Sequence, residues 1–329
     1  MSVAPPDVET LADGIRAGDR GALARGITLV ESSRAQDRPR ARALVNSLRE
    51  RTGTATRVGV SGVPGVGKST FIEALGGLLV DSGRRVAVLA VDPTSTRSGG
   101  SILGDKTRME RLAHHPGAFI RPSPSRGALG GVAAATREAI MLCEAAGFDV
   151  ILVETVGVGQ SEVMVSELVD CFLVLMLANA GDELQGIKRG ILELVDVLVI
   201  NKADGDQLAA AKLAAGEYRR ALQLMPPRTP DWTVPVQTCS ALQGVDIDEV
   251  WAAVVRHRVH LEEDDRLTTQ RRRQAVTSTH RMLEAELLRA LQEDPEAAAR
   301  MRTQLAAVED GALSPADAVE EILATFLRR

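Results

Sequence analysis

The sequence predicts an α/β fold with a mainly parallel central sheet flanked by helices, and three observations lead to that prediction. Short apolar, β-branched runs alternate with helix-length segments between about residues 54 and 260. A glycine-rich string follows the first run and leads into a helix. Polar residues directly follow several later runs, at the strand ends where such sheets bind ligands. The chain of 329 residues has room for one large domain with accessory segments.

The apolar runs are expected to be buried strands. Their near-continuous hydrophobicity indicates burial on both faces, which is typical of a parallel sheet with helices on each side. The predicted strands cover residues 57–61, 86–91, 119–120, 150–153, 172–177, 195–200 and 234–239. We therefore expect a central domain at residues 54–260.

The first 53 residues predict a helical extension. Apolar residues recur at helical spacing in three groups, with breaks at Gly18, Gly21 and Pro39. The groups are Val8, Leu11 and Ile15, then Leu23, Ile27 and Val30, then Leu44, Val45 and Leu48. We expect these helix faces to pack on the central domain.

Residues 261–329 again predict helices. One apolar stripe consists of Val276, Leu283, Leu287 and Leu291 and ends at Pro295. A last helix is expected to begin at the capping sequence 314–317, because serine, proline and an acidic residue occupy its first positions. That helix is expected to bury Val319, Ile322, Leu323 and Phe326. The basic run 271–273 is typical of a solvated helix face, with an anion site as the alternative.

The glycine-rich string matches the pattern G-x-x-x-x-G-K-[ST]. It consists of Gly62, Val63, Pro64, Gly65, Val66, Gly67, Lys68 and Ser69, and Thr70 follows in the helix. Glycines let backbone N–H groups converge on phosphate oxygens, and the helix N-terminus adds partial positive charge. Lys68 would reach the β- and γ-phosphates and the Ser69 hydroxyl would ligate Mg²⁺. The string predicts a P-loop NTPase.

The base is predicted to be guanine. Asn201, Lys202 and Asp204 directly follow the strand at 195–200. A carboxylate at Asp204 can accept two hydrogen bonds from the N1–H and 2-amino group of guanine, which adenine cannot donate. The stem of Lys202 can cover the base, and Asn201 can tie this turn to the phosphate loop. Ser240, Ala241 and Leu242 follow the next strand, where a backbone amide would meet guanine O6. GTP and GDP are the expected ligands.

Three acidic residues are candidates for the metal and the γ-phosphate. Asp92 and Glu154 each end a predicted strand, and Asp105 lies in a polar, glycine-rich loop. Together with Ser69 these carboxylates could hold Mg²⁺, which prefers oxygen ligands and keeps several waters. The alternative for Asp92 and Glu154 is a helix-capping role. The N–H of Gly157 can meet the γ-phosphate and so report hydrolysis.

The residue after Gly157 indicates slow hydrolysis. Val158 stands where many small GTPases carry the glutamine that orients the attacking water, and Gln160 lies two residues further on. With Lys68, Asp92, Asp105 and Glu154 as the catalytic set, we expect a slow intrinsic GTPase whose site a partner completes.

The composition excludes several other classes. The net charge is −5 and aromatic residues make up only 2% of the chain, which argues against nucleic-acid binding. No apolar run reaches the length of a membrane helix, and the N-terminus lacks a secretory pattern. The three cysteines form no CxxC pair, and the five histidines predict no metal cluster. We expect a cytoplasmic protein that contacts neither membrane nor nucleic acid.

Taken together, the motifs resemble those of MeaB-type GTPases. The strings that carry the resemblance are 61–69, 91–95 with 99–108, 154–162 and 201–204, and it extends over nearly the whole chain. These GTPases are chaperones of adenosylcobalamin-dependent methylmalonyl-CoA mutase, and their human counterpart is the methylmalonic aciduria type A protein. An older name for such bacterial sequences is arginine/ornithine transport-system kinase.

The resemblance implies properties that composition and spacing do not show. It implies that GTP hydrolysis gates cofactor delivery to methylmalonyl-CoA mutase or a related mutase and protects that enzyme. It also implies a homodimer formed largely through the C-terminal helices at 261–329, and it makes residues 179–188 an additional switch.

Two other functions stay open as alternatives. A metal-insertion GTPase would be expected to carry a histidine-rich tract or a cysteine pair near its switch region, and the sequence has neither. A kinase that passes the γ-phosphate to a protein or small molecule would need a base for the acceptor hydroxyl, which the sequence does not identify.

Overall fold

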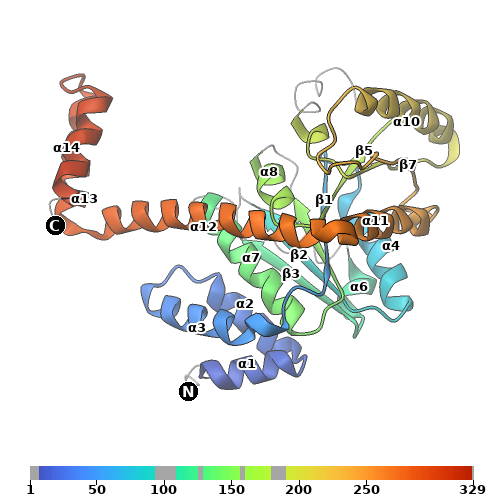
Figure 1. Ribbon diagram of the computed structural model, residues 1–329, viewed down its shortest axis with the longest axis horizontal. Helices are drawn as coiled ribbons and strands as arrows, with labels where there is room; N and C mark the ends of the chain where they lie inside the picture. The colour runs from blue at the N-terminus through green and yellow to red at the C-terminus, as the bar shows by residue number, and fades with distance from the viewer. Residues whose placement is uncertain (1–6, 93–108, 125–128, 156–159, 179–189, 328–329) are drawn as a thin grey trace. The chain divides into compact units, whose positions relative to one another are not determined.

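The computed structural model describes residues 7–92, 109–124, 129–155, 160–178 and 190–327 (Figure 1). Asp105, Gly157 and the segment 179–188, all singled out by the sequence, lie outside these ranges. The chain divides into two units, residues 1–275 and 276–329, and each is described by itself.

The first unit is built on a sheet of seven strands that all run parallel, in the order β3-β2-β4-β1-β5-β6-β7. The strands are β1 (Thr56–Gly62), β2 (Val86–Asp92), β3 (Ala118–Pro124), β4 (Val150–Thr155), β5 (Cys171–Met176), β6 (Val197–Ile200) and β7 (Val236–Thr238). The predicted α/β class and the parallel sheet are therefore confirmed. The main difference lies at β3, which continues four residues beyond the expected strand.

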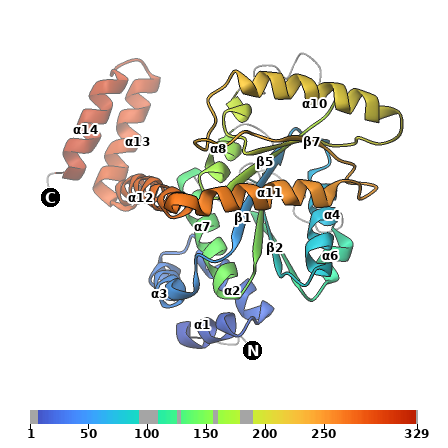
Figure 2. The same cartoon turned by 45° about the vertical axis from the view of Figure 1, so that its right-hand side comes forward.

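Helices cover both faces of this sheet (Figure 2). One face packs against α1 (Val8–Arg16), α2 (Arg20–Val30), α3 (Arg38–Leu48), α7 (Leu129–Ala145), α8 (Gln160–Ser166) and α10 (Leu208–Gln223). The other packs against α4 (Lys68–Asp81), α6 (Glu110–His114) and α11 (Ile247–Glu262). Each face has its own hydrophobic core, because side chains alternate across a strand.

The strand β1 shows how tightly these layers pack. Val58 and Val60 belong to the core beside α4 and are fully buried. Gly59 faces the opposite layer, where a Cβ atom would lie 2.8 Å from the ring of Phe172. Only glycine permits that approach. Because all strands are parallel, the carboxyl ends of β1, β4 and β6 lie at one edge of the sheet.

The N-terminal helices α1–α3 pack on the sheet unit as expected. Ile15, Ile27 and Leu44 are fully buried in the core that includes α7. Gly18, with φ +77°, separates α1 from α2. Gly21 and Pro39 do not break helices; they lie in the first turns of α2 and α3, where a helix tolerates them.

Ion pairs fasten the amino ends of the strands to the surrounding helices. Arg57 on β1 donates to Glu144 of α7 at 2.9 Å. Asp170, just before β5, accepts from Arg258 of α11 at 3.2 Å and from Arg271 at 2.7 Å. Arg271 belongs to α12 (Arg266–Glu293) and also donates to the carbonyl of Ala55. The first residue of the basic run thus has a structural role that the sequence did not indicate.

The unit of residues 276–329 contains the rest of α12 and a helical hairpin. This hairpin is formed by α13 (Pro295–Glu309) and α14 (Pro315–Leu327), which pack on each other. The predicted cap is present, since the Ser314 hydroxyl accepts from the N–H of Asp317 at 3.2 Å. The burial expected for α14 is wrong in part. Ile322 is buried, but Val319 and Leu323 are exposed, because two helices cover only one stripe of each other.

In the part of the chain that the structure describes, no helix has both the length and the apolarity needed to cross a membrane.

Candidate nucleotide site

The phosphate-loop string joins β1 to α4 at the carboxyl edge of the sheet. Its three glycines, Gly62, Gly65 and Gly67, have φ values of +149°, +77° and +96°. A Cβ atom at Gly62 would lie 2.4 Å from the carbonyl oxygen of Leu175, and one at Gly67 would lie 2.8 Å from Nδ2 of Asn201. The positive φ values favour glycine at all three positions, and at Gly62 and Gly67 a side chain would also clash. The loop ends at the N-terminus of α4, a position that suits anions.

Lys68 lies back over the loop. Its Nζ donates to the carbonyl of Gly62 at 2.8 Å and that of Val63 at 3.4 Å. The ammonium group is thus held beside the loop, where it can neutralise phosphate charge. Thr70, in the first turn of α4, is exposed.

Ser69 and Glu154 are brought together by the pairing of β1 with β4. The Ser69 hydroxyl donates to Oε1 of Glu154 at 3.1 Å, and Glu154 is buried, with 6% of its surface exposed. This pair of oxygens at the N-terminus of α4 is a donor set that suits Mg²⁺. Beneath it, the buried hydroxyl of Thr155 donates to Ser61 at 2.9 Å. Sequence reasoning missed the contact between Thr155 and Ser61, although both residues follow apolar runs.

Of the other two candidate carboxylates, the structure describes only the backbone of Asp92. Asp92 is the last residue of β2, and its neighbour Val91 pairs with Thr155 of β4. The backbone of Asp92 therefore ends at the same sheet edge. Asp105 and Gly157 fall outside the described residues, so their predicted roles stay predictions.

Asn201 joins three turns of the site. Its Nδ2 donates to the carbonyl of Val66 in the phosphate loop at 2.8 Å. Its Oδ1 accepts from the N–H of Ala241 at 3.0 Å, in the turn that follows β7. The adjacent Lys202 donates to the carbonyl of Gly65 at 2.9 Å. The expected tie between this turn and the phosphate loop is present in the contacts, and it uses backbone carbonyls.

The carboxylate of Asp204 is oriented by Ser240. The Ser240 hydroxyl donates to Oδ2 of Asp204 and accepts from the N–H of Gln243. Leu242, beside them, is 83% exposed and lies at the surface. A short turn between Ser240 and Val245 fixes this segment, because the two residues form an isolated antiparallel bridge.

Cys239 is a further residue at the site that sequence reasoning did not single out. Burial, and then the nearby Asp246, raise the pKa of its thiol to about 12. The thiol therefore stays protonated at neutral pH, and its Sγ donates to Oδ1 of Asn201 at 3.5 Å. Only its place between a strand and the Ser-Ala-Leu string could have indicated this contact.

Comparisons with known proteins place the chain in a family. Residues 23–296 match the family described as "Methylmalonyl Co-A mutase-associated GTPase MeaB". The chain is 52% identical to a Caulobacter vibrioides protein named as a GTPase, over 97% of this chain and 98% of that protein. It is 45% identical to the GTPase ArgK of Escherichia coli, over 95% of this chain and 96% of ArgK.

Two further matches extend the comparison. The mouse protein named methylmalonic aciduria type A homolog, mitochondrial, is 42% identical over 98% of this chain and 80% of its own length. The crystal structure of a LAO/AO transport system kinase superposes with a TM-score of 0.76 at 38% identity, covering 98% of both chains. With a nucleotide-binding P-loop fold and GTPase relatives along its whole length, the chain belongs to the MeaB family of methylmalonyl-CoA mutase-associated GTPases.

Proposed function

We propose that this protein binds GTP and GDP together with Mg²⁺ and that GTP hydrolysis controls its action on a partner enzyme. The observation that carries the proposal is the position of Asn201. One amide side chain contacts both the phosphate loop, through Val66, and the Ala241 turn beside Asp204. A ligand with a guanine at one end and phosphates at the other would match the two halves of the site that this residue joins.

Guanine selectivity is assigned to Asp204. Ser240 donates to one of its oxygens, so the carboxylate is oriented before a base arrives. Guanine would donate two hydrogen bonds to that carboxylate, whereas adenine would donate none at its N1 position, and such a mismatch discriminates strongly. The stem of Lys202, held by its contact with Gly65, would cover the face of the base.

Phosphate and metal would be held at the N-terminus of α4. Ser69 would ligate Mg²⁺ and Glu154 would bind it directly or through water, with Asp92 and Asp105 as further metal and switch residues. Mg²⁺, when bound, supplies charge neutralisation at the β- and γ-phosphate oxygens. Lys68 would turn from the carbonyl of Gly62 to these oxygens, and the N–H of Gly157 would contact the γ-phosphate.

Hydrolysis by the isolated chain is expected to be slow. No glutamine follows Gly157 directly, and positioning of the attacking water is assigned to a partner. The partner we propose is an adenosylcobalamin-dependent acyl-CoA mutase, most directly methylmalonyl-CoA mutase, after which the family is named. The chain would act as its chaperone in cofactor loading and protection, as a homodimer.

The decisive experiment combines purified protein, GTP labelled at the γ-phosphate and purified methylmalonyl-CoA mutase. Label is expected in inorganic phosphate, slowly without mutase and faster with it. Retention of the mutase on immobilised protein should also depend on a non-hydrolysable GTP analogue. Label transferred to protein would instead favour a kinase. Turnover at tens per second without any partner would contradict the proposed division of labour.

A further inference from the structure

A pocket lies at the opposite end of the sheet from the candidate nucleotide site. It has a volume of about 500 Å³ and is lined at the amino ends of β6 and β7, whose carboxyl ends lead to Asn201 and Ser240. Its walls are largely apolar, and two guanidinium groups, those of Arg219 and Arg228, belong to its lining. Apolar walls with a few polar groups are typical of small-molecule sites.

Arg228 is held in place by a buried carboxylate. It forms an ion pair with Asp196, which is fully buried, and it donates to the carbonyl of Ser166 at 2.5 Å. Asp196 also accepts from the hydroxyl of Thr229 and the N–H of Phe172, each at 2.9 Å. The charge of Arg228 is therefore compensated within the protein, and its position is fixed.

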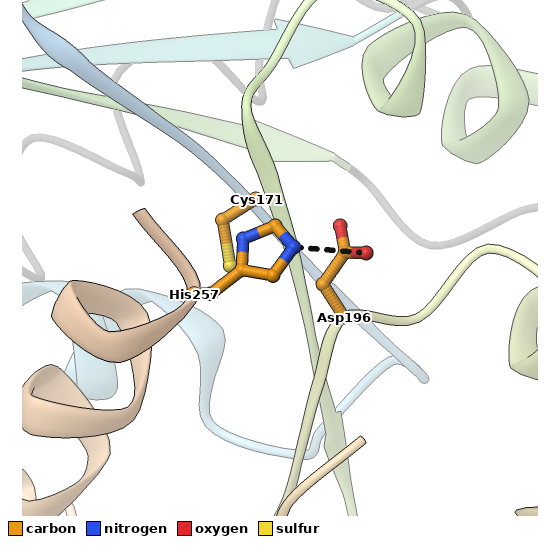
Figure 3. Close-up of side chains that lie close together, drawn as sticks. All are labelled: Cys171, Asp196 and His257. Atoms are coloured by element: carbon orange, nitrogen blue, oxygen red, sulfur yellow. Dashed lines mark ion pairs between the residues drawn. The ribbon is translucent and has the colours of Figure 1, made fainter. Parts of the chain in front are cut away.

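The same carboxylate belongs to a cluster with Cys171 and His257 (Figure 3), whose potential ligand atoms lie within 4.8 Å of one another. The sequence predicted no metal cluster from its histidines. The geometry alone would allow one, but Asp196 already accepts bonds from three donors, one of them a guanidinium, which disfavours a cation there. The cluster instead supports the pocket wall. The indole N–H of Trp232 donates to the carbonyl of Asp196 at 2.8 Å, and its ring packs edge-on against His257.

Arg219 differs from Arg228 because its charge is not compensated by an ion pair. It lies on α10 and is exposed, and its Nη2 donates to the carbonyl of Val236 at 3.0 Å. In the described part of the chain it forms no ion pair with a carboxylate within 4.0 Å. A positive charge thus borders a pocket whose other walls include Leu222, Trp232 and Pro235.

We propose that this pocket binds an amphiphilic monoanion, a small molecule with an apolar body and one carboxylate. The body lies against Trp232 and against the wall formed by Pro226, Pro227 and Pro235. The carboxylate accepts hydrogen bonds from Arg219. The rigid support of Arg228 and Trp232 by the buried cluster preorganises the wall, which lowers the cost of binding. The site is separate from the nucleotide site and does not depend on it.

The test uses octanoate as the probe and Trp232 as the reporter. The chain has two tryptophans, so Trp251→Phe leaves Trp232 as the sole indole fluorophore. Octanoate should change its fluorescence saturably, and Arg219→Ala should weaken binding about fivefold or more, the effect of one lost charge-assisted contact at an exposed site. The matched control is Arg220→Ala, since Arg220 is the exposed neighbour outside the lining. It should bind octanoate within about twofold of the parent, as expected of a surface charge.

Octanamide supplies the second arm, because it keeps the apolar chain and lacks the charge. It should bind the parent protein several times more weakly than octanoate, and Arg219→Ala should remove that difference. Absence of a saturable response, equal binding of octanoate and octanamide, or equal losses in the Arg219 and Arg220 variants would overturn the proposal.

Discussion

Lys68 illustrates how single residues prepare the site for a phosphate. Its ammonium donates to two backbone carbonyls of the phosphate loop, so the positive charge already lies beside the position where the phosphates would bind. Replacement by alanine removes the cation and leaves the loop glycines in place. We expect Lys68→Ala to weaken GTP binding roughly 10- to 100-fold, the range for a charge-assisted hydrogen bond. Titration with a fluorescent GTP analogue measures this. Unaltered affinity would remove Lys68 from the binding site.

Glu138 gives a prediction about pH at the same scale. Burial on α7 raises the pKa of its carboxyl to about 7, and Arg42 opposes that rise. Because the pKa in the folded protein exceeds the ordinary value of 4.5, the folded state binds the proton more tightly than the unfolded state. The stability contributed by this proton is present at low pH and is lost as pH rises from about 4.5 to about 7.

The variant Glu138→Gln cannot ionise, so it should avoid this loss. It should be more stable than the parent by about 3 kcal/mol at pH 8, since each pKa unit corresponds to about 1.4 kcal/mol, and the difference should be small near pH 4.5. Urea unfolding at both pH values measures this. The control is Glu217→Gln, on the exposed part of α10. A gain that is equal at both pH values would contradict the account.

The residues that sequence reasoning proposed for the site are those whose side chains would carry the chemistry. Asp204 was singled out because few other side chains could read the edge of guanine, and Asn201 because its amide could join that turn to the phosphate loop. The contacts that hold this turn in place could not be predicted. Asn201 and Lys202 donate to the backbone carbonyls of Val66 and Gly65, and because every residue has a carbonyl, the sequence does not mark these acceptors. Cys239 was missed for a similar reason, since a buried thiol more often packs in the core than donates a hydrogen bond.

At the scale of elements, the phosphate loop depends on two glycines in different ways. Gly62 is confined by the carbonyl of Leu175, 2.4 Å from where a Cβ atom would lie, whereas Gly65 has nothing within 4 Å. Both have positive φ values. Gly65→Ala should therefore lower the free energy of unfolding by about 1 kcal/mol, through backbone strain alone. Gly62→Ala should lower it by about 3 kcal/mol, because the clash is added.

Thermal or urea denaturation of the two alanine variants measures the free energy of unfolding. The difference between the variants separates the cost of backbone strain from the cost of the steric clash at Gly62. Each serves as the control for the other, since the added methyl group is the same. Equal losses in the two variants would show that the close approach of Gly62 to β5 is not maintained in solution.

The seven strands could be predicted because burial on both faces leaves a continuous apolar run. The end of β3 could not, because Arg121, Pro122 and Pro124 break the pattern. The structure explains why they are tolerated: β3 is an edge strand, where proline costs no inter-strand hydrogen bond. The burial on α14 was misjudged because helical spacing shows which side is apolar and not whether another helix covers it.

At the scale of the whole molecule, residues 276–329 carry an apolar surface that their own helices do not cover. Val276, Leu283 and Leu287 on α12 are each more than half exposed. Exposed apolar stripes commonly mark an interface, which is consistent with the homodimer that the family resemblance implies.

We expect the double variant Leu283→Glu, Leu287→Glu to be a monomer, with GTP affinity unchanged because the nucleotide site lies in the other unit. Light scattering coupled to gel filtration measures the mass. Leu213→Glu on α10 is the control, because Leu213 is 66% exposed but lies in residues 1–275. A parent protein that is already monomeric at micromolar concentration would contradict the dimer.

The central claim is that a guanine nucleotide binds between the phosphate loop and Asp204. Calorimetric titration of the parent and of Asp204→Asn with GTP, XTP and ATP tests it most directly. The carboxylate of the parent would accept a hydrogen bond from the 2-amino group of guanine, whereas the amide of the variant would donate one to the C2 oxygen of xanthine. The account predicts that the parent prefers GTP and that the variant prefers XTP, with ATP bound weakly by both. A parent that prefers ATP, or a variant that keeps its full preference for GTP, would contradict it.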